Sequence, residues 1–575
     1  MPLRRLALAA LLLVSAGNAR CETAAAPEIL THRSRHWVVQ LPPELAAQRT
    51  PESWGAAADR RLEEVAGRLG LKPAGEPLHL YLDDSTRRLE ARAGSDAPFT
   101  VHSDRREVAH LVGPAGTITD ACGDALLLLH LAWGPPGSET LAAAVARSGA
   151  GDFHGQPLAV YAARIAREEE PYPLREILRL GSNPDKREAQ LSPLVSDALG
   201  GAWVEHLRAE RGPGVLERLW KTQGDEKALA TALGTSWEEL EKDWRTWLAR
   251  RPAPPRAVPI PKLSGFLRGI SFSHEVRSEG YGSDAAAAQL ARIRALGADA
   301  VSIVPYGFTR APEDPTVRYL GTDESEDRVL RTMEQAKRLG LKTVLKPQLW
   351  APRRFTGDIV FERPADFERW WAGYRRWMLH QARVAALGRA DLLVIGTELG
   401  GVTRHQDAWR RLIRDVRRIY PGPLTYAANW SGDFETMPFW GDLDLLGLNM
   451  YYPLAGPGEQ PRAGSPQVRE LRTKLAAMAR RHRKPILFTE IGYAASAGAA
   501  TEPWKENHGA LDPALQARCY EVVFEAFSRE PWLAGLFWWK WPSHGQGAPD
   551  DPSFSPLGKP ALGVLERWYG KRLAR

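Results

Sequence analysis

The sequence predicts a (β/α)8 barrel over residues 262–575, preceded by an N-terminal domain of the mainly α or α+β class. Three observations carry this prediction. After residue 262, short apolar runs alternate with longer amphipathic stretches, which is typical of βα units around a parallel sheet. Eight such runs can be counted, the number that closes a barrel. Residues 251–261 contain five prolines, which forbid a regular helix and favour an extended linker between two domains.

The predicted barrel strands and helices follow one another in regular order. The strands cover residues 267–272, 300–305, 342–348, 391–396, 424–429, 443–449, 485–489 and 534–539. Apolar residues at helical spacing predict helices over 286–296, 327–339, 367–387, 408–419, 467–480 and 513–528. The interval between the fifth and sixth strands is short, so its helix must be short or irregular, unless a strand there is miscounted.

The N-terminal domain, predicted over residues 27–250, begins with a strand at 78–82 and continues mostly as helix. Its last helix, over 237–248, is amphipathic and starts with acidic side chains, which suits the helix dipole. The first 19 residues read as a signal peptide, with two arginines, an apolar run too short to span a bilayer, and Gly17-Asn18-Ala19 before the cleavage point. We therefore expect an exported protein, either periplasmic or secreted.

Lipidation at Cys21 is the alternative to a simple cleavage, but Arg20 stands where a lipoprotein signal needs a small residue. The chain has 3 cysteines, too few for a disulfide framework in 575 residues. No other stretch is apolar enough for a transmembrane helix, so we expect no membrane-spanning segment in the mature chain. The net charge of +7 is small and the arginines are scattered along helix-like stretches, which argues against a nucleic-acid partner.

Two glutamates stand where a barrel enzyme places its catalytic groups. Glu398 lies just past the fourth apolar strand and Glu490 just past the seventh. Active sites of such barrels lie at the carboxyl ends of the strands. Cleavage of a glycosidic bond requires one carboxylic acid to protonate the leaving oxygen and a second carboxylate to attack carbon or to activate water. A single glutamate is usually a solvated residue or an ion-pair partner, but two at these positions predict a glycosidase.

The segments around these glutamates resemble a known enzyme family. GISF at 269–272, GTEL at 396–399, LNMYY at 448–452 and TEIGY at 489–493 are similar to segments of glycoside hydrolase family 113, whose known members are endo-β-1,4-mannanases. The resemblance covers nearly all of residues 262–575. It implies that Glu398 is the general acid/base and Glu490 the nucleophile, about 5–5.5 Å apart, with anomeric retention. It also implies a polysaccharide or oligosaccharide substrate, with mannan as the expected sugar.

One residue departs from the pattern of the wider clan. Thr397 stands immediately before the acid/base, where many members of the clan carry an asparagine that holds the sugar 2-hydroxyl. A threonine hydroxyl can still make a contact there, so this departure weakens the choice of sugar more than the reaction class.

Further candidate substrate-binding residues follow the predicted strands. Tryptophan and tyrosine rings stack on the flat faces of sugars, and polar side chains at strand ends bind hydroxyl groups. Trp539 or Trp541 is the expected floor of the −1 subsite, and Tyr451 is expected to donate a hydrogen bond to Glu490. Alternation along a strand predicts that one of Trp538 and Trp539 points outward. Lys346 is expected to bind a hydroxyl or to tune the pKa of a glutamate. The other candidates are His274, Gln348, Trp350, Asn429 and Trp430.

The end of the N-terminal domain, residues 194–248, resembles the last part of gluzincin-like peptidase domains. Such domains hold zinc through a His-Glu-x-x-His helix, but this motif is missing, and the segment starting at Cys122 lacks both histidines and the glutamate. We therefore expect a degenerate domain with no metal and no cofactor, serving as a scaffold with a cell-envelope partner. Two alternatives to a glycosidase remain: a carbohydrate-binding scaffold without turnover, and a zinc peptidase with an appended barrel.

Overall fold

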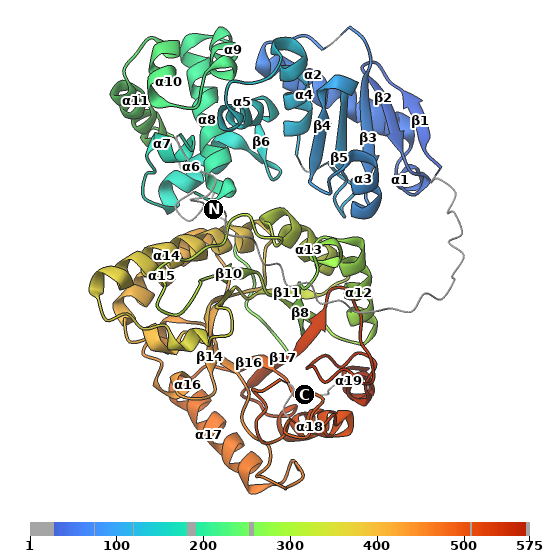
Figure 1. The fold of residues 1–575 in the computed structure, drawn as a ribbon, viewed down its shortest axis with the longest axis vertical. Coiled ribbons are helices and arrows are strands. Elements are labelled where there is room, and N and C mark those ends of the chain that lie inside the picture. The colour runs from blue at the N-terminus through green and yellow to red at the C-terminus, as the bar shows by residue number, and fades with distance from the viewer. Residues whose placement is uncertain are drawn as a thin grey trace, which may run out of the picture.

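A computed structural model describes residues 28–73, 75–118, 120–180, 191–251, 258–506 and 509–570. The chain forms two domains, an N-terminal domain of helices and sheet and a C-terminal barrel (Figure 1). The predicted signal peptide at 1–19, Cys21 and most of the proline-rich linker lie outside the described residues. In the described part of the chain, every helix is too short or too polar to cross a membrane.

The C-terminal domain is a closed barrel of eight parallel strands, as predicted. In chain order the strands are β8 (Leu267–Ser273), β9 (Ala300–Ile303), β11 (Lys342–Leu345), β13 (Leu392–Thr397), β14 (Leu424–Asn429), β15 (Leu446–Asn449), β16 (Ile486–Ile491) and β17 (Leu533–Pro542). The last strand closes the barrel by pairing with the first, with Phe537 opposite Gly269. A Cβ on Gly269 would lie 2.3 Å from the Phe537 ring, so a glycine is needed there for that ring to help fill the barrel.

Two predicted strands end earlier in the structure than the sequence suggested. The predicted strands covered 300–305 and 342–348, but β9 ends at Ile303 and β11 at Leu345. Pro305 and Pro347 have no N–H group to donate to a neighbouring strand, so each interrupts the ladder. Beyond them, β10 (Tyr306–Phe308) and β12 (Gln348–Trp350) form a separate parallel pair, with Tyr306 opposite Gln348.

The barrel helices match the predicted intervals. They are α12 (Asp284–Ala295), α13 (Glu326–Arg338), α14 (Pro364–Leu387), α15 (Gln406–Ile419), α17 (Pro466–His482) and α18 (Pro513–Phe527), followed by α19 (Pro560–Gly570). Side-chain caps fix several starts: Ser465 accepts a hydrogen bond from the Val468 amide, and Asp512 accepts one from Leu515. The doubtful interval between β14 and β15 holds the four-residue helix α16 (Asp433–Thr436), so the strand count was correct.

The N-terminal domain is of the α+β class, the second of the two predicted classes. Its five-stranded sheet has the order β1-β2-β3-β5-β4, from β1 (Leu30–Arg33), β2 (Trp37–Leu41), β3 (Leu78–Asp83), β4 (Phe99–His102) and β5 (Glu107–Leu111). The helices are α1 (Pro43–Gln48), α2 (Pro51–Leu69), α3 (Thr86–Ala93), α4 (Cys122–Trp133), α5 (Glu139–Ala150), α6 (Leu158–Glu168), α7 (Leu174–Ile177), α8 (Pro193–Arg211), α9 (Gly214–Lys221), α10 (Glu226–Leu233) and α11 (Trp237–Ala249). The last begins with a capping box of Ser236 and Glu239, in agreement with its acidic start.

The N-terminal domain lies against the side of the barrel that carries α12, α13 and α14 (Figure 1). Asp284 of α12 accepts hydrogen bonds from the Ser85 hydroxyl at 2.6 Å and the Thr86 amide at 3.2 Å, and so caps helix α3 of the other domain. Arg383 of α14 is buried and pairs with Glu168 at 2.9 Å. Charged side chains of the barrel therefore form hydrogen bonds and ion pairs with the N-terminal domain across this interface.

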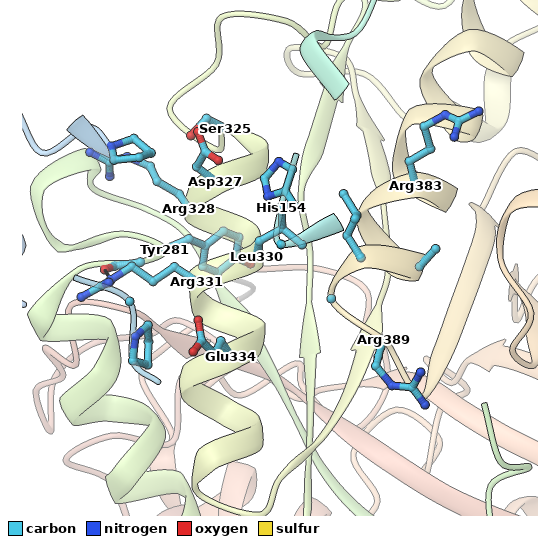
Figure 2. A pocket seen from close by; sticks show the side chains of 18 of the residues that line it. His154, Tyr281, Ser325, Asp327, Arg328, Leu330, Arg331, Glu334, Arg383 and Arg389 are labelled. Carbon is cyan, nitrogen blue, oxygen red and sulfur yellow. Dashed lines mark hydrogen bonds between the residues drawn. The ribbon is translucent and has the colours of Figure 1, made fainter. Parts of the chain in front are cut away.

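A cavity of about 1480 Å³ lies between the two domains (Figure 2). His154 of the N-terminal domain lines it together with Tyr281, Asp327 and Arg328 of the barrel. None of the predicted catalytic or sugar-binding residues is among its lining residues. The cavity is therefore not the catalytic cleft itself.

Candidate active site

Both predicted catalytic glutamates lie where the barrel ladder is irregular. Glu398 follows β13, and the pairing of β13 with β14 shifts register between Val394 and Thr397. Its φ of 52° is in the left-handed region, which a glutamate rarely adopts, and its N–H donates to the Ala427 carbonyl at 2.9 Å. Glu490 lies within β16, whose pairings with both neighbouring strands shift register beside it. Such bulges turn side chains away from the regular alternation and are common next to active sites.

The Glu490 carboxylate is held by three side chains from the ends of two strands, β11 and β15. The Lys346 ammonium lies 2.6 Å from Oε2, and the Tyr451 hydroxyl donates a short hydrogen bond to Oε1. The Asn449 amide donates to Oε2 at 3.4 Å. Glu490 is 6% exposed and Lys346 is fully buried. A cation and two neutral donors therefore surround a carboxylate that is nearly shielded from water, which orients it and stabilises its charge.

Glu398 has a different environment. Asn429 of β14 donates a hydrogen bond to its Oε1 at 3.0 Å. Burial and the negative charge of Glu490 raise the pKa of Glu398 to about 7, while a hydrogen bond from Asn449 and the charge of Lys346 act in the opposite direction. The two carboxyl groups are thus close enough to influence each other. Glu490 is paired with the Lys346 ammonium, whereas Glu398 is biased toward its protonated form.

Aromatic side chains surround the glutamates. Tyr451 packs with Ala494 and Phe554, and the rings of Trp430 and Trp539 pack against this cluster. Trp539 also lies beside Lys346, with the ammonium 5.8 Å from the ring centroid. Three of the predicted sugar-binding aromatics are therefore brought together next to Glu490: Trp430 after β14, Tyr451 after β15 and Trp539 within β17.

The structure corrects the expectation for Trp541. Its ring is fully buried, its Nε1 donates to Gln289 of α12 at 3.1 Å, and the Arg292 guanidinium lies 5.3 Å from its centroid. It therefore packs outward and cannot floor a sugar subsite, whereas Trp539 keeps partial exposure. Trp538 is also turned outward, stacked on Tyr520 of α18 at 3.7 Å, which confirms that one member of the Trp538–Trp539 pair points away from the cleft.

The remaining predicted polar residues have mixed environments. His274 is held by the Tyr281 amide, which donates to its Nδ1 at 3.0 Å, and burial lowers its pKa to about 4, so the ring is neutral. The buried Thr397 hydroxyl donates to the Pro347 carbonyl at 3.3 Å and keeps a lone pair free. Gln348 has a buried Oε1 that meets no hydrogen-bond partner among the described residues. Trp350 is 46% exposed and lies edge-on to Phe308.

Two residues of the site were missed in the sequence. Asn449 donates a hydrogen bond to Glu490, and its Oδ1 accepts one from the Thr489 hydroxyl at 3.0 Å. Its place at the end of a predicted strand was a usable signal. Tyr306 is the other, because burial and the charge of Glu490 raise its pKa. It follows Pro305 in an unpredicted strand, and no sequence pattern pointed to it.

A family model matches the barrel that carries the two glutamates. The model of Glycoside Hydrolase Family 113 covers residues 270–559 of the chain. The chain belongs to glycoside hydrolase family 113. It is therefore a glycoside hydrolase with a carbohydrate substrate, which confirms the resemblance read from the sequence.

Several solved structures are similar to the barrel. A GH113 β-mannanase from Alicyclobacillus acidocaldarius, in complex with ManMIm, is 30% identical, and the match covers 53% of this chain and 98% of that chain with a TM-score of 0.48. A complex of a GH113 β-1,4-mannanase is 24% identical over 54% of this chain and 100% of that chain, with a TM-score of 0.49. No curated protein matches the chain by sequence.

The position of Tyr451 makes a test of the site possible. Replacing Tyr451 by phenylalanine removes one hydrogen bond to the Glu490 carboxylate and leaves the ring in place. A hydrogen bond to a charged group contributes about 1.5–3 kcal/mol, so we expect kcat to fall about 10- to 100-fold. Tyr452→Phe is the control, because the ring of Tyr452 faces Trp430 and Lys474. Equal losses in the two variants would show that the Glu490 hydrogen bond is unimportant.

Proposed function

We propose that this family 113 enzyme is an exported, retaining glycosidase in which Glu490 is the nucleophile and Glu398 the acid/base. The unequal environment of the two carboxyl groups carries the assignment. Glu490 contacts Lys346, Tyr451 and Asn449, which favour a carboxylate. Glu398 has a pKa raised to about 7 by burial and by the charge of Glu490, which favours a proton on it.

The reaction proceeds as a double displacement. In the first step a Glu490 oxygen forms a bond to the anomeric carbon while the glycosidic bond breaks and Glu398 gives its proton to the leaving oxygen. The positive charge that develops on the sugar ring faces the Glu490 carboxylate. In the second step Glu398, now ionised, removes a proton from water, and the resulting oxygen attacks the anomeric carbon and releases Glu490. Each glutamate returns to its starting state.

The aromatic surface supports an oligosaccharide or polysaccharide as substrate. Trp539, packed beside Lys346 and Tyr451, is placed to contact the sugar that reacts with Glu490. On the acid/base side, Trp430 follows Asn429 and stacks on Trp504 at 4.9 Å, and Trp504 is 43% exposed. Because Glu398 protonates the leaving group, this exposed pair is placed to contact sugar on the leaving-group side. The family relationship makes β-1,4-mannan the substrate that we propose.

The direct experiment is hydrolysis of manno-, gluco- and xylo-oligosaccharides by the full chain, with the products followed by ¹H NMR. We expect β-linked manno-oligosaccharides to be cleaved fastest and the β-anomer to appear first. Initial release of the α-anomer would contradict the retaining mechanism. Faster cleavage of the gluco- or xylo-series would contradict mannan as the substrate. The choice of sugar needs this test because Thr397 stands where many members of the clan carry an asparagine that holds the sugar 2-hydroxyl.

The pKa of Glu398 predicts an alkaline limit to activity. Glu398 must carry a proton to act as an acid, and burial together with the Glu490 charge raises its pKa to about 7. We therefore expect kcat/KM to be lost as the pH rises through about 7, with a tenfold fall per unit above it. Replacement of Glu490 by glutamine removes the negative charge that raises the pKa of Glu398, so this pKa should fall. ¹³C NMR of the Glu398 carboxyl carbon measures the change. A pH profile that stays flat to pH 9 would contradict this assignment.

We further propose that the chain is exported and that its N-terminal domain serves as a scaffold with a cell-envelope partner. The basic and apolar pattern of residues 1–19 supports export, and secretion into a bacterial periplasm or medium can be tested by fractionation. In the N-terminal domain, helix α4 buries Asp124, which pairs with His110 at 2.9 Å and with Arg61. Among the described residues there is no group of three or more His, Cys, Asp or Glu side chains that could hold a metal ion.

A further inference from the structure

The N-terminal domain lies outside the residues that the family model matches, yet it contacts the barrel next to the catalytic cleft. We propose that Asp96 of this domain and Arg328 of the barrel are positioning residues, which hold the segment 274–282 at the rim of the cleft. This segment connects β8 with α12. The proposal rests on the proposed function for the identity of the cleft and adds a role for the N-terminal domain in it.

Arg328 joins three parts of the chain. It lies in the first turn of α13, and its Nη2 donates to Asp96, which lies between α3 and β4 of the N-terminal domain. Its Nη1 donates to the backbone carbonyl of Arg277 at 2.8 Å. The side chains of Asp96 and Arg328 are 17% and 15% exposed, so water screens this ion pair much less than a surface pair. The Arg328 guanidinium thus links the N-terminal domain to the segment 274–282 through direct hydrogen bonds.

The same segment is linked through Lys540 to Trp539, the ring that floors the proposed −1 subsite. Glu275 Oε1 lies 2.7 Å from the Lys540 ammonium, and Lys540 directly follows Trp539. The Lys540 ammonium lies 5.8 Å from the centroid of the Trp539 ring. A continuous set of contacts therefore runs from Asp96 through Arg328 and the segment 274–282 to Lys540 and Trp539.

A second arginine of α13 holds the other end of the segment. Arg331 Nε donates to the Gly282 carbonyl at 3.0 Å, while its two terminal nitrogens donate to the carbonyls of Val112 at 2.9 Å and Asp84 at 2.6 Å. Both carbonyls belong to the N-terminal domain. Figure 2 shows Arg328, Arg331 and Glu334 on the same side of α13. Arg328 and Arg331 therefore tie the middle and the end of the segment to the same domain.

Tyr281, near the end of the segment, is fully buried in the barrel core, but residues 275–279 have little regular structure of their own. Residues 275–278 are exposed, Val276 is 45% exposed, and only a three-residue 3-10 turn, Arg277–Glu279, is formed. Segments with few buried apolar contacts open locally at low free-energy cost. Contacts from outside must then supply much of the order of residues 275–279, and the hydrogen bond from Arg328 to the Arg277 carbonyl is in the right place to do so.

The test compares Asp96→Ala with Glu334→Ala in the full chain. Glu334 is a matched control, because its carboxylate also bridges α13 to the N-terminal domain, accepting from the Ala115 amide at 2.7 Å, but it contacts a part of that domain away from the rim. Hydrogen exchange measured by mass spectrometry should be about tenfold faster over residues 274–282 in Asp96→Ala, and unchanged there in Glu334→Ala. Asp96→Glu, which keeps the carboxylate, should restore slow exchange.

Kinetics give the second readout. With mannohexaose as the probe, Asp96→Ala should raise KM about fivefold and leave kcat within about twofold, because the catalytic glutamates are untouched. Unchanged exchange over 274–282 in Asp96→Ala, or equal acceleration in both alanine variants, would overturn the proposal. Exchange does not depend on the substrate, so a wild-type enzyme that cleaves no glycan would refute the proposed function and leave this test intact.

Discussion

Replacing Glu490 by glutamine should reduce kcat by about 10⁴-fold or more on any substrate. The amide cannot form the covalent bond to the anomeric carbon, and it cannot stabilise the positive charge that develops on the sugar ring. The loss should be the same for natural oligosaccharides and for aryl glycosides with good leaving groups, because both need the nucleophile. Steady-state rates on the two substrate types, measured with the same enzyme preparation, test this expectation.

The controls for this variant follow from the structure. Glu470→Gln changes an exposed glutamate of α17 and should leave turnover unchanged. Glu490→Gln also leaves the buried Lys346 ammonium without its carboxylate, which is destabilising. The double variant with Lys346→Met removes both charges and restores a neutral pair, so it should be as inactive as the single variant and more stable to heat. Activity within tenfold of wild type in a folded variant would rule out Glu490 as the nucleophile.

Replacing Glu398 by glutamine should lower kcat/KM on oligosaccharides by about 10²- to 10⁴-fold. The reason is loss of the proton that neutralises the leaving oxygen. An aryl glycoside with an acidic phenol needs little protonation, so its first step should be nearly normal and the covalent intermediate should accumulate. A burst of phenol followed by a slow steady state would demonstrate this, because the second step still needs a base to activate water.

A small anionic nucleophile such as azide distinguishes this role from general damage. Azide needs no base, so it should accelerate the steady state of Glu398→Gln and leave wild type unaffected. The alkaline loss of activity should also disappear in this variant, since the group that titrates is gone. Equal losses on both substrate types, with no burst and no response to azide, would contradict the acid/base role of Glu398.

The barrel could be predicted because its signals are local. Each strand is an apolar run within a few residues, and each helix repeats apolar residues on one face, so the number and order of elements follow from the sequence. Glu398 and Glu490 could be found for the same reason, since each lies just past such a run. The ends of β9 and β11 were harder to predict. Pro305 and Pro347 interrupt the strand pairing only where a neighbouring strand needs an N–H donor, and the neighbouring strand is not known from the sequence.

The tertiary structure decided which side chains meet. Trp539 and Trp541 would share a face in a regular strand, but β17 shifts register between Trp538 and Trp541, and Trp541 packs on α12 instead. The partner of Lys346 is 144 residues away in the chain, a separation at which no local pattern exists. Asp96 and Arg328 are likewise in different domains. The sequence by itself determined the barrel, the order of its strands and the positions of the two glutamates, since these depend on short-range periodicity. The contacts that set the charge of each glutamate and the shape of the cleft depend on distant segments, which only folding brings together.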